Sequence, residues 1–158
     1  MNANAVIFDE LNNMNEFKVK KLRDDAELPK RGSKYAAGYD LVACMDDPVY
    51  IAPGHVAKIG TGLSFKLPTW CFGAIFARSG LAAKRGLRPA NAVGVADCDY
   101  RGEYIVALYN DSDCEQVIFP GDRIAQLVIL PFLCPEFELV SELDNTDRGD
   151  GGFGSTGV

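Results

Sequence analysis

Two acidic residues separated by one position, Asp97 and Asp99, are the first candidates for chemistry in this sequence. Two apolar residues precede them, and Tyr100 with an Arg–Gly pair leads on into a predicted strand. Most acidic pairs in turns are solvated surface groups, but this setting predicts partial burial, and a buried carboxylate requires a partner or a catalytic role. Asp97 is the stronger candidate because the apolar residues come directly before it.

Further polar side chains interrupt apolar strands. Asp40 stands inside segment 38–42, where aspartate is unfavourable. Asp40 lies at the edge of a turn, or hydrogen-bonds to a nearby loop, or belongs to a cation-linked site. Arg123 and Gln126 lie in the apolar segment 121–127, and a buried glutamine needs several hydrogen-bond partners, which a ligand could supply. Each of these signals is weak when taken alone.

The composition limits the chemistry that such residues can serve. The formal net charge is −6, which disfavours binding along a nucleic-acid backbone. A small polyanion could still be held by a few convergent arginines, and the candidates are Arg78, Arg101, Arg123 and Arg148. The single histidine, His55, follows a Pro–Gly turn and excludes two-histidine metal sites. Any hydrolysis must therefore depend on carboxylates, arginines and a bound cation.

The length and the cysteines bound the class of protein. The 158 residues predict one domain with its own core. No apolar run approaches the roughly 18 residues that span a bilayer, and the first residues lack the basic-then-apolar pattern of a targeting peptide. The five cysteines are scattered singly, which suits neither a disulfide framework nor a zinc site. We therefore expect reduced thiols in a cytoplasmic protein that does not bind membranes.

The elements that must position these residues have the periodicity of strands. Segments rich in β-branched and aromatic residues recur between turn signals, and the expected strands are 17–22, 39–44, 56–67, 71–77, 103–110, 116–119 and 124–130. Pro–Gly occurs twice, in the similar segments 49–54 and 117–121, each of which indicates a strand and a turn. Many short strands at this spacing predict an all-β fold, a jelly-roll-like barrel or sandwich.

Two stretches depart from the strand pattern. Residues 79–86 have an N-cap candidate in Ser79, a helix-forming middle and a final glycine, which predict one short helix whose free N–H groups favour an anion. The glycine-rich segment 147–157 is either a frayed tail or, given its Arg, Phe, Ser and Thr, a segment that cradles phosphate. We predict a flexible N-terminal arm (1–16), a β domain (17–140) and a C-terminal arm (141–158) that closes over the active site.

Taken in order along the chain, these segments resemble the five short motifs of the trimeric dUTPase family. The match covers roughly residues 17–157, and five ordered motifs are far more specific than any one of them. The segments that resemble the motifs are Ala37–Leu41, Arg78–Ala82, Gly94–Gly102 with the strand that follows it, Gly121–Leu127 and Arg148–Gly157.

The resemblance implies a jelly-roll homotrimer that hydrolyses dUTP to dUMP and pyrophosphate with Mg²⁺. Each of its active sites is expected to draw residues from more than one subunit. Asp97 is then the general base that activates a water for attack on the α-phosphate, and Tyr100 packs against the deoxyribose. A hairpin reads uracil largely through its backbone, and its expected contacts are Asn91, Val95, Ala96 and Ile105.

The resemblance also implies how the phosphates are held. Asp40 touches Mg²⁺ through water, while the ion is bound mainly by the substrate phosphates. Arg148 grips the γ-phosphate and Phe153 caps the uracil. The other residues expected to hold the phosphate chain are Arg78, Ser79, Gly80, Gln126, Gly154, Ser155 and Thr156.

Two positions depart from the family pattern. Ala77 stands where proline is usual, and Cys98 stands between the two aspartates, which makes it a candidate for oxidation or alkylation. Three other functions are alternatives: a dCTP deaminase-like enzyme of the same fold, a regulator that binds dUTP as a signal, and a structural jelly-roll protein. The first lacks an additional acid/base residue. The regulator would not need the intact base and lid, and the structural protein leaves the Phe153 tail unexplained.

Overall fold

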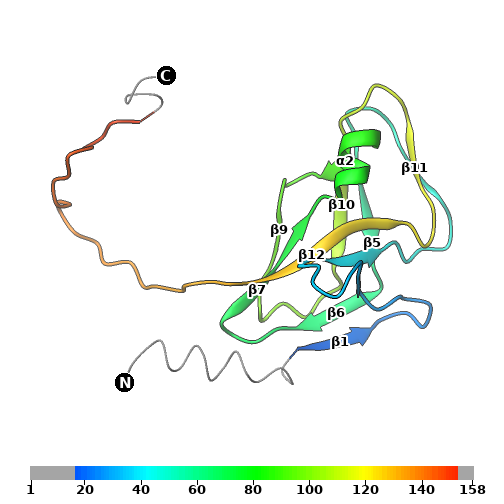
Figure 1. Ribbon diagram of the computed structural model, residues 1–158, viewed down its shortest axis with the longest axis horizontal. Helices are drawn as coiled ribbons and strands as arrows, with labels where there is room; N and C mark the ends of the chain where they lie inside the picture. Colours follow the sequence, from blue (N-terminus) through cyan, green and yellow to red (C-terminus); the bar gives the residue numbers. More distant parts are fainter. Residues whose placement is uncertain (1–16, 153–158) are drawn as a thin grey trace.

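The computed structural model describes residues 17–152, which fold into a β-sandwich with one short helix, α2 (Ser79–Arg85) (Figure 1). Every strand pairing in this part of the chain is antiparallel. In chain order the strands are β1 (Lys18–Lys21), β2 (Lys30–Arg31), β3 (Tyr39–Val42), β4 (Val49–Ile51), β5 (Val56–Gly60), β6 (Leu63–Lys66), β7 (Cys71–Phe76), β8 (Leu87–Pro89), β9 (Gly94–Ala96), β10 (Ile105–Asn110), β11 (Gln116–Ile118) and β12 (Arg123–Pro131).

The strands form two main sheets and two smaller pairs. The largest sheet has five strands in the order β2-β3-β12-β7-β9, the second has the order β5-β10-β8, and the pairs are β1-β6 and β11-β4. Successive side chains of β10 point to opposite faces of its sheet. Val106 and Leu108 are therefore buried, whereas Ala107 and Tyr109 are only partly buried. The buried pair shares one hydrophobic cluster with Leu41 of the five-stranded sheet. Many short antiparallel strands around one core confirm the expected all-β, jelly-roll-like fold.

The expected strand 56–67 is interrupted and forms two strands, β5 and β6. Between them Gly62 has a φ of +66°, a left-handed conformation that favours glycine. The buried hydroxyl of Thr61 donates to the Tyr104 carbonyl at 2.7 Å, which fastens the break to the chain entering β10. The two similar Pro–Gly segments lie side by side, because their strands β4 and β11 pair with each other.

The expected helix is present, but its N-cap is not Ser79. Ser79 is the first helical residue, and the N-cap position is occupied by Arg78, whose side chain makes no capping hydrogen bond. Arg78 is extended (φ −83°, ψ 129°) because it continues directly from the end of β7. Gly86 ends the helix with a φ of +64°, as expected. The Arg85 guanidinium donates to the Gln116 side chain at 3.0 Å and so ties the helix to β11.

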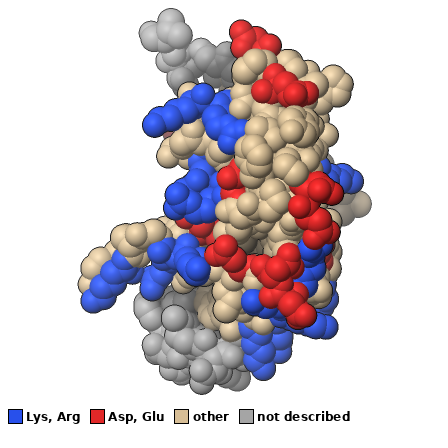
Figure 2. All heavy atoms as spheres, turned by 90° about the vertical axis from the view of Figure 1, so that its right-hand side faces the viewer, with Lys and Arg blue, Asp and Glu red and all other residues tan. Residues whose placement is uncertain are grey.

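Beyond β12 the chain leaves the sandwich as an extended segment (Figure 1). Residues 132–152 contain no strand or helix, and their most exposed large apolar side chains are Leu133, Phe137, Leu139 and Leu143. On the face in Figure 2, basic side chains lie mainly along one edge and acidic side chains lie over the middle and the opposite side. Within residues 17–152 no helix is long and apolar enough to cross a membrane.

Candidate active site

A pocket of about 230 Å³ lies among β7, β9 and the start of β10. Pairing of β9 with β7, followed by a loop that turns back into β10, explains why residues from 91 to 105 meet there. The predicted site residues that line the pocket are Asn91, Val95, Ala96, Asp97, Tyr100 and Ile105, and the others are Ile75, Gly94, Glu103 and Tyr104. The structure thus gathers the residues expected around a nucleobase and sugar.

The loop between β9 and β10 is held in a compact turn by its own hydrogen bonds. The Tyr100 amide donates to the Asp97 carbonyl at 3.1 Å, and the Tyr100 hydroxyl donates to the Glu103 carbonyl at 3.2 Å. The Arg101 guanidinium donates to the Cys98 carbonyl at 2.7 Å, so this candidate for anion binding stabilises the turn. The partial burial expected for the two aspartates is wrong, because the turn of residues 97–100 leaves both Asp97 and Asp99 exposed. The Asp97 carboxylate lines the pocket, forms no hydrogen bond or ion pair with another described residue, and is free to accept a proton from water.

Tyr104 lines the same pocket from the core side. Its ring lies 4.4 Å from the Phe65 ring and 6.2 Å from the Tyr100 ring, measured between centroids. The side chain is only 2% exposed, and the hydroxyl has no hydrogen-bond partner among the described residues. Burial raises the pKa of Tyr104 to about 12. The hydroxyl has room because residue 73 in β7 is glycine: a Cβ atom there would lie 3.2 Å from it.

A second group of predicted residues forms a charged cluster on the five-stranded sheet. Asp40 in β3 accepts hydrogen bonds from two arginines, with Arg78 Nε 2.7 Å from Oδ1 and Arg123 Nη1 3.2 Å from Oδ2. The Asp40 side chain is 18% exposed and that of Arg78 25% exposed. Asp40 lies inside β3 and not at the edge of a turn, and its described partners are two guanidinium groups, an arrangement that none of the three alternatives named.

Gln126 belongs to this cluster through strand register. In the five-stranded sheet Gln126 of β12 lies opposite Asp40 on one side and Phe76 on the other. Its Nε2 donates to the Ala77 carbonyl at 2.9 Å, directly before Arg78. Ser79 and Gly80 follow in the exposed first turn of α2, so the phosphate-binding residues expected from two separate motifs are adjacent.

The pocket and the charged cluster are separate within one chain. On β7, Phe76 lies opposite Gln126 of the charged cluster, and Gly73 lies opposite Ala96, the residue before Asp97. Phe76 and Gly73 are three residues apart. At about 3.3 Å per strand residue this is about 10 Å along the sheet. No hydrogen bond or ion pair among residues 17–152 joins the two groups. The pocket at Asp97 and the charged cluster at Asp40 are therefore two neighbouring groups with no direct polar contact between them in the part of the chain that the structure describes.

The predicted residues of the C-terminal arm are not gathered with either group. Arg148 lies in a turn in which its Nε donates to the Gly151 carbonyl at 2.8 Å. The four other predicted residues of the arm, Phe153, Gly154, Ser155 and Thr156, lie outside the described residues. Their roles stay predictions.

The described part of the chain cannot enclose a metal ion by itself. Residues 17–152 contain no group of three or more His, Cys, Asp or Glu side chains placed to hold one. Both Asp40 oxygens already accept an arginine N–H, but each keeps a second lone pair. The donor set fits an outer role for Asp40, toward a water of an Mg²⁺ ion that takes most of its oxygen ligands from elsewhere.

Glu103 and Tyr104 are pocket residues that we did not predict. Glu103 accepts the Gly62 amide at 2.7 Å through Oε1 and so links the pocket to the β5–β6 turn. The alternation that buries Val106 and Leu108 extends back to Tyr104, so the pattern of β10 could have identified it. Nothing in the sequence around Glu103 indicates its contact with Gly62, because the two are far apart along the chain.

On this β-sandwich, an exposed carboxylate on a pocket and a nearby arginine cluster supply groups suited to activating water and to binding a small phosphorylated ligand. The dUTPase family model matches residues 24–157. The deoxyuridine 5'-triphosphate nucleotidohydrolase of Desulfitobacterium hafniense (strain DSM 10664 / DCB-2) is 52% identical over 150 residues, which are 92% of this chain and 99% of that protein. The corresponding protein of Paramecium bursaria Chlorella virus 1 is 46% identical, over 92% of this chain and all of its own length.

Solved structures agree with these relatives. The Staphylococcus bacteriophage 80alpha dUTPase with dUPNHPP has a TM-score of 0.82 and 31% identity, with 92% of this chain and all of that chain covered. The chain therefore belongs to the dUTPase family. The expected resemblance is confirmed, and the hydrolase class with it.

Proposed function

We propose that this chain hydrolyses dUTP to dUMP and pyrophosphate in the cytoplasm, and that Asp97 is the general base. The observation that carries this proposal is the exposed, unpaired Asp97 carboxylate on a pocket of nucleoside size. Asp97 accepts a proton from water as the water oxygen bonds to the α-phosphorus. The bond from the α-phosphorus to the bridging oxygen breaks, and pyrophosphate leaves. The five free cysteines fit a reducing compartment.

The pocket supports selectivity for a deoxyuridine group. Asn91 supplies a side-chain amide, and the backbone of β9 with that of Ile105 supplies N–H and C=O groups at the pocket edge. Tyr100 is held in place by its hydroxyl bond to the Glu103 carbonyl, so that its ring is a fixed wall beside the sugar. A fixed aromatic wall excludes a 2′-hydroxyl by size, and this selects dUTP over UTP.

The charged cluster supports binding of the triphosphate. Arg78 supplies a guanidinium, Gln126 an amide, and Ser79 and Gly80 supply exposed groups at the start of α2. Bound Mg²⁺ would neutralise charge on the phosphate oxygens, with Asp40 as its contact through water. The C-terminal arm, with Arg148 and the predicted residues 153–156, closes over the ligand and excludes bulk water.

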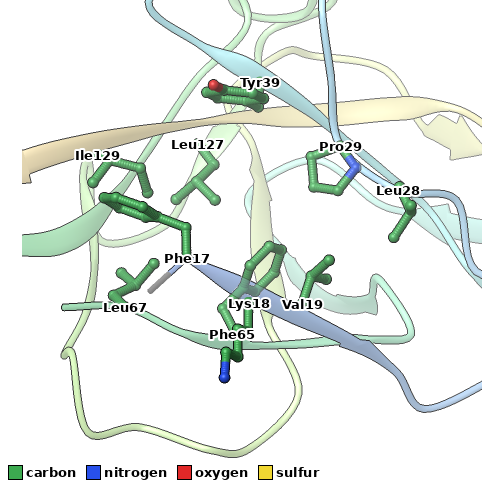
Figure 3. Close-up of a pocket in the computed structure, with 10 residues that line it drawn as sticks. All are labelled: Phe17, Lys18, Val19, Leu28, Pro29, Tyr39, Phe65, Leu67, Leu127 and Ile129. Atoms are coloured by element: carbon green, nitrogen blue, oxygen red, sulfur yellow. The ribbon is translucent and has the colours of Figure 1, made fainter. Parts of the chain in front are cut away.

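The separation of pocket and cluster supports a homotrimer with shared active sites. In such a trimer each site would take its pocket from one subunit and its cluster from a neighbour, because no polar contact among the described residues joins the two groups within one chain. The extended segment after β12 has exposed apolar side chains that a single chain leaves uncovered. A groove of about 360 Å³ is lined by residues of β1, of β12 and of the chain around them, and it offers an apolar surface for such a segment of another subunit. Figure 3 shows Phe17 close to Ile129 and Leu67 in this groove.

The test is hydrolysis by the purified full chain with Mg²⁺, offered dUTP, UTP, dCTP and dTTP in turn. We expect pyrophosphate from dUTP alone, and a loss of about 10²–10⁴-fold in kcat for Asp97→Asn. Asp99→Asn is the matched control and should retain most of the activity. Ammonia release from dCTP would favour a deaminase, and tight dUTP binding without turnover would favour a regulator; either result would contradict the proposal.

A further inference from the structure

Arg123 occupies a special position in β12. The register between β12 and β3 shifts there, from Arg123 opposite Val42 to Ala125 opposite Leu41, so Ile124 is an extra residue. Such a β-bulge re-aims the side chains around it. The turn before the bulge is fixed, because Asp122 accepts the Phe119 amide at 2.9 Å through its side chain. The start of β12 is therefore built to hold Arg123 in one orientation.

Arg123 contacts both charged partners in the cluster, Asp40 and Arg78. Its guanidinium bonds to Oδ2 of Asp40, and its carbonyl accepts Arg78 Nη1 at 3.4 Å. One carboxylate and two guanidinium groups give the cluster a net charge of +1 in a protein of net charge −6. Arg123 is 59% exposed, whereas Arg78 is 25% exposed and gives its Nε to Asp40.

The Asp40 carboxylate, which Arg78 shares with Arg123, competes with a phosphate for the Arg78 guanidinium. A phosphate that binds Arg78 must compete with Asp40, whose full negative charge both attracts Arg78 and repels the phosphate. A second cation on the other Asp40 oxygen reduces both effects. Arg123 is that cation, and its position does not require a contact with the ligand.

We propose that Arg123 is a positioning residue that neutralises Asp40 and thereby leaves Arg78 available to the substrate phosphates. The inference rests on the proposed function and extends it by one residue. Arg123 acts on ligand binding, because neutralising Asp40 lowers the electrostatic free energy needed to bring a polyanion to Arg78. It therefore predicts a change in KM and in ligand affinity, with kcat nearly unchanged.

The experiment measures equilibrium binding of dUpNHpp and of inorganic triphosphate by calorimetry, alongside kcat and KM for dUTP. We expect Arg123→Gln to weaken binding of both ligands by about tenfold and to raise KM similarly, with kcat within about twofold. Arg123→Lys restores the charge and should recover most of the affinity. Arg88→Gln is the matched control, since Arg88 also pairs with a single aspartate, Asp111, on the other sheet.

A double-mutant cycle separates positioning from direct contact. In an Asp40→Asn background, Arg123→Gln should cause no further loss, because the charge that Arg123 neutralises is already gone. An equal loss in both backgrounds would mean that Arg123 touches phosphate directly and would overturn the inference. Unchanged binding in Arg123→Gln, or failure of Arg123→Lys to recover it, would overturn it too. Absence of dUpNHpp binding by the wild-type chain would instead refute the proposed function, and the inference with it.

Discussion

Gly38, directly before β3, lies so close to the Gln126 side chain of β12 that a side chain at position 38 would displace Gln126. A Cβ atom on Gly38 would lie 2.8 Å from Gln126 Oε1, closer than real Cβ contacts come. The same Gln126 side chain donates to the Ala77 carbonyl at 2.9 Å. Gln126 is thus held between a glycine of the first motif and the residue before Arg78. This one amide thus links the first and fourth motifs with the residue that precedes the second.

Gly38→Ala should impair activity much more than stability. The clash is with the far end of a flexible side chain, so Gln126 can rotate away at little cost to folding, but it then loses the Ala77 carbonyl and its place in the cluster. We expect kcat/KM for dUTP to fall roughly tenfold, the equivalent of one lost hydrogen bond to a charged ligand. The melting temperature should change by less than about 2 °C.

Gly32→Ala is the control for this prediction, because a Cβ atom on Gly32 would meet nothing within 4 Å. It should leave both quantities unchanged. Wild-type kcat/KM in Gly38→Ala would show that the position of Gln126 is irrelevant to turnover.

Much of the fold follows from local patterns, which is why the main strands and the helix could be predicted. Alternating side chains specify β10, and the left-handed Gly86 ends the helix where expected. Two features were beyond such patterns. β9 has only three residues, and the break at Gly62 depends on Glu103 and Thr61, whose partners are distant in sequence.

In the candidate site, too, local sequence patterns predicted some residues but not the contacts between them. Residue types and their order indicated Asp97 and Asp40, because carboxylates beside apolar residues are unusual. The pairing of Asp40 with two arginines depends on strand register and on the bulge at Arg123, which no local signal reveals. The gap between pocket and cluster is likewise a property of the sheet, since it arises from where β9 and β12 lie along β7.

Phe137→Asp should convert the proposed trimer to a monomer. Phe137 is 95% exposed in the single chain and alternates with Glu136 and Glu138, as expected for a strand with one apolar face. A charge on that face would have to be buried against an apolar surface, which is unfavourable. Sedimentation equilibrium should report a mass near 17.1 kDa, and activity should be lost because the sites are shared. Tyr35→Asp, also at an exposed aromatic residue, should remain trimeric; a trimeric Phe137→Asp would rule out this segment as part of the interface.

Tyr104→Phe should stabilise the protein. Its buried hydroxyl has no partner among the described residues, so the native state bears a desolvation cost that phenylalanine removes. We expect a gain of about 1 kcal/mol, or about 2–4 °C in melting temperature. Tyr50→Phe, at an exposed tyrosine, should have no effect. A lower melting temperature for Tyr104→Phe would reveal that a bound water satisfies the hydroxyl.

Tyr104 also makes the stability of the fold depend on pH in the alkaline range. Burial raises the pKa of Tyr104 from its ordinary 10 to about 12, so the folded state keeps a proton that the unfolded state releases. Ionisation of Tyr104 therefore costs the fold no stability below pH 10, and the free energy of unfolding falls as the pH rises from 10 to about 12. Burial of Cys71 adds a similar decline, because its pKa rises from 9 to about 11. In chemical denaturation, the stability advantage of Tyr104→Phe over wild type should therefore be constant below pH 10 and should increase between pH 10 and about 12, since only the wild-type side chain ionises.

Alkylation of Cys98 should inactivate the enzyme. Cys98 is half-buried, directly after Asp97, and its carbonyl accepts the Arg101 bond that holds the turn, so an added group would disturb the loop that carries the base. Cys114 and Cys134 are exposed and should react with iodoacetamide first, without loss of activity. Peptide mass spectrometry read beside residual dUTP hydrolysis should show that activity falls in step with modification of Cys98. Cys98→Ala should resist the reagent and Cys114→Ala should not; equal inactivation of both variants would place the sensitive thiol elsewhere.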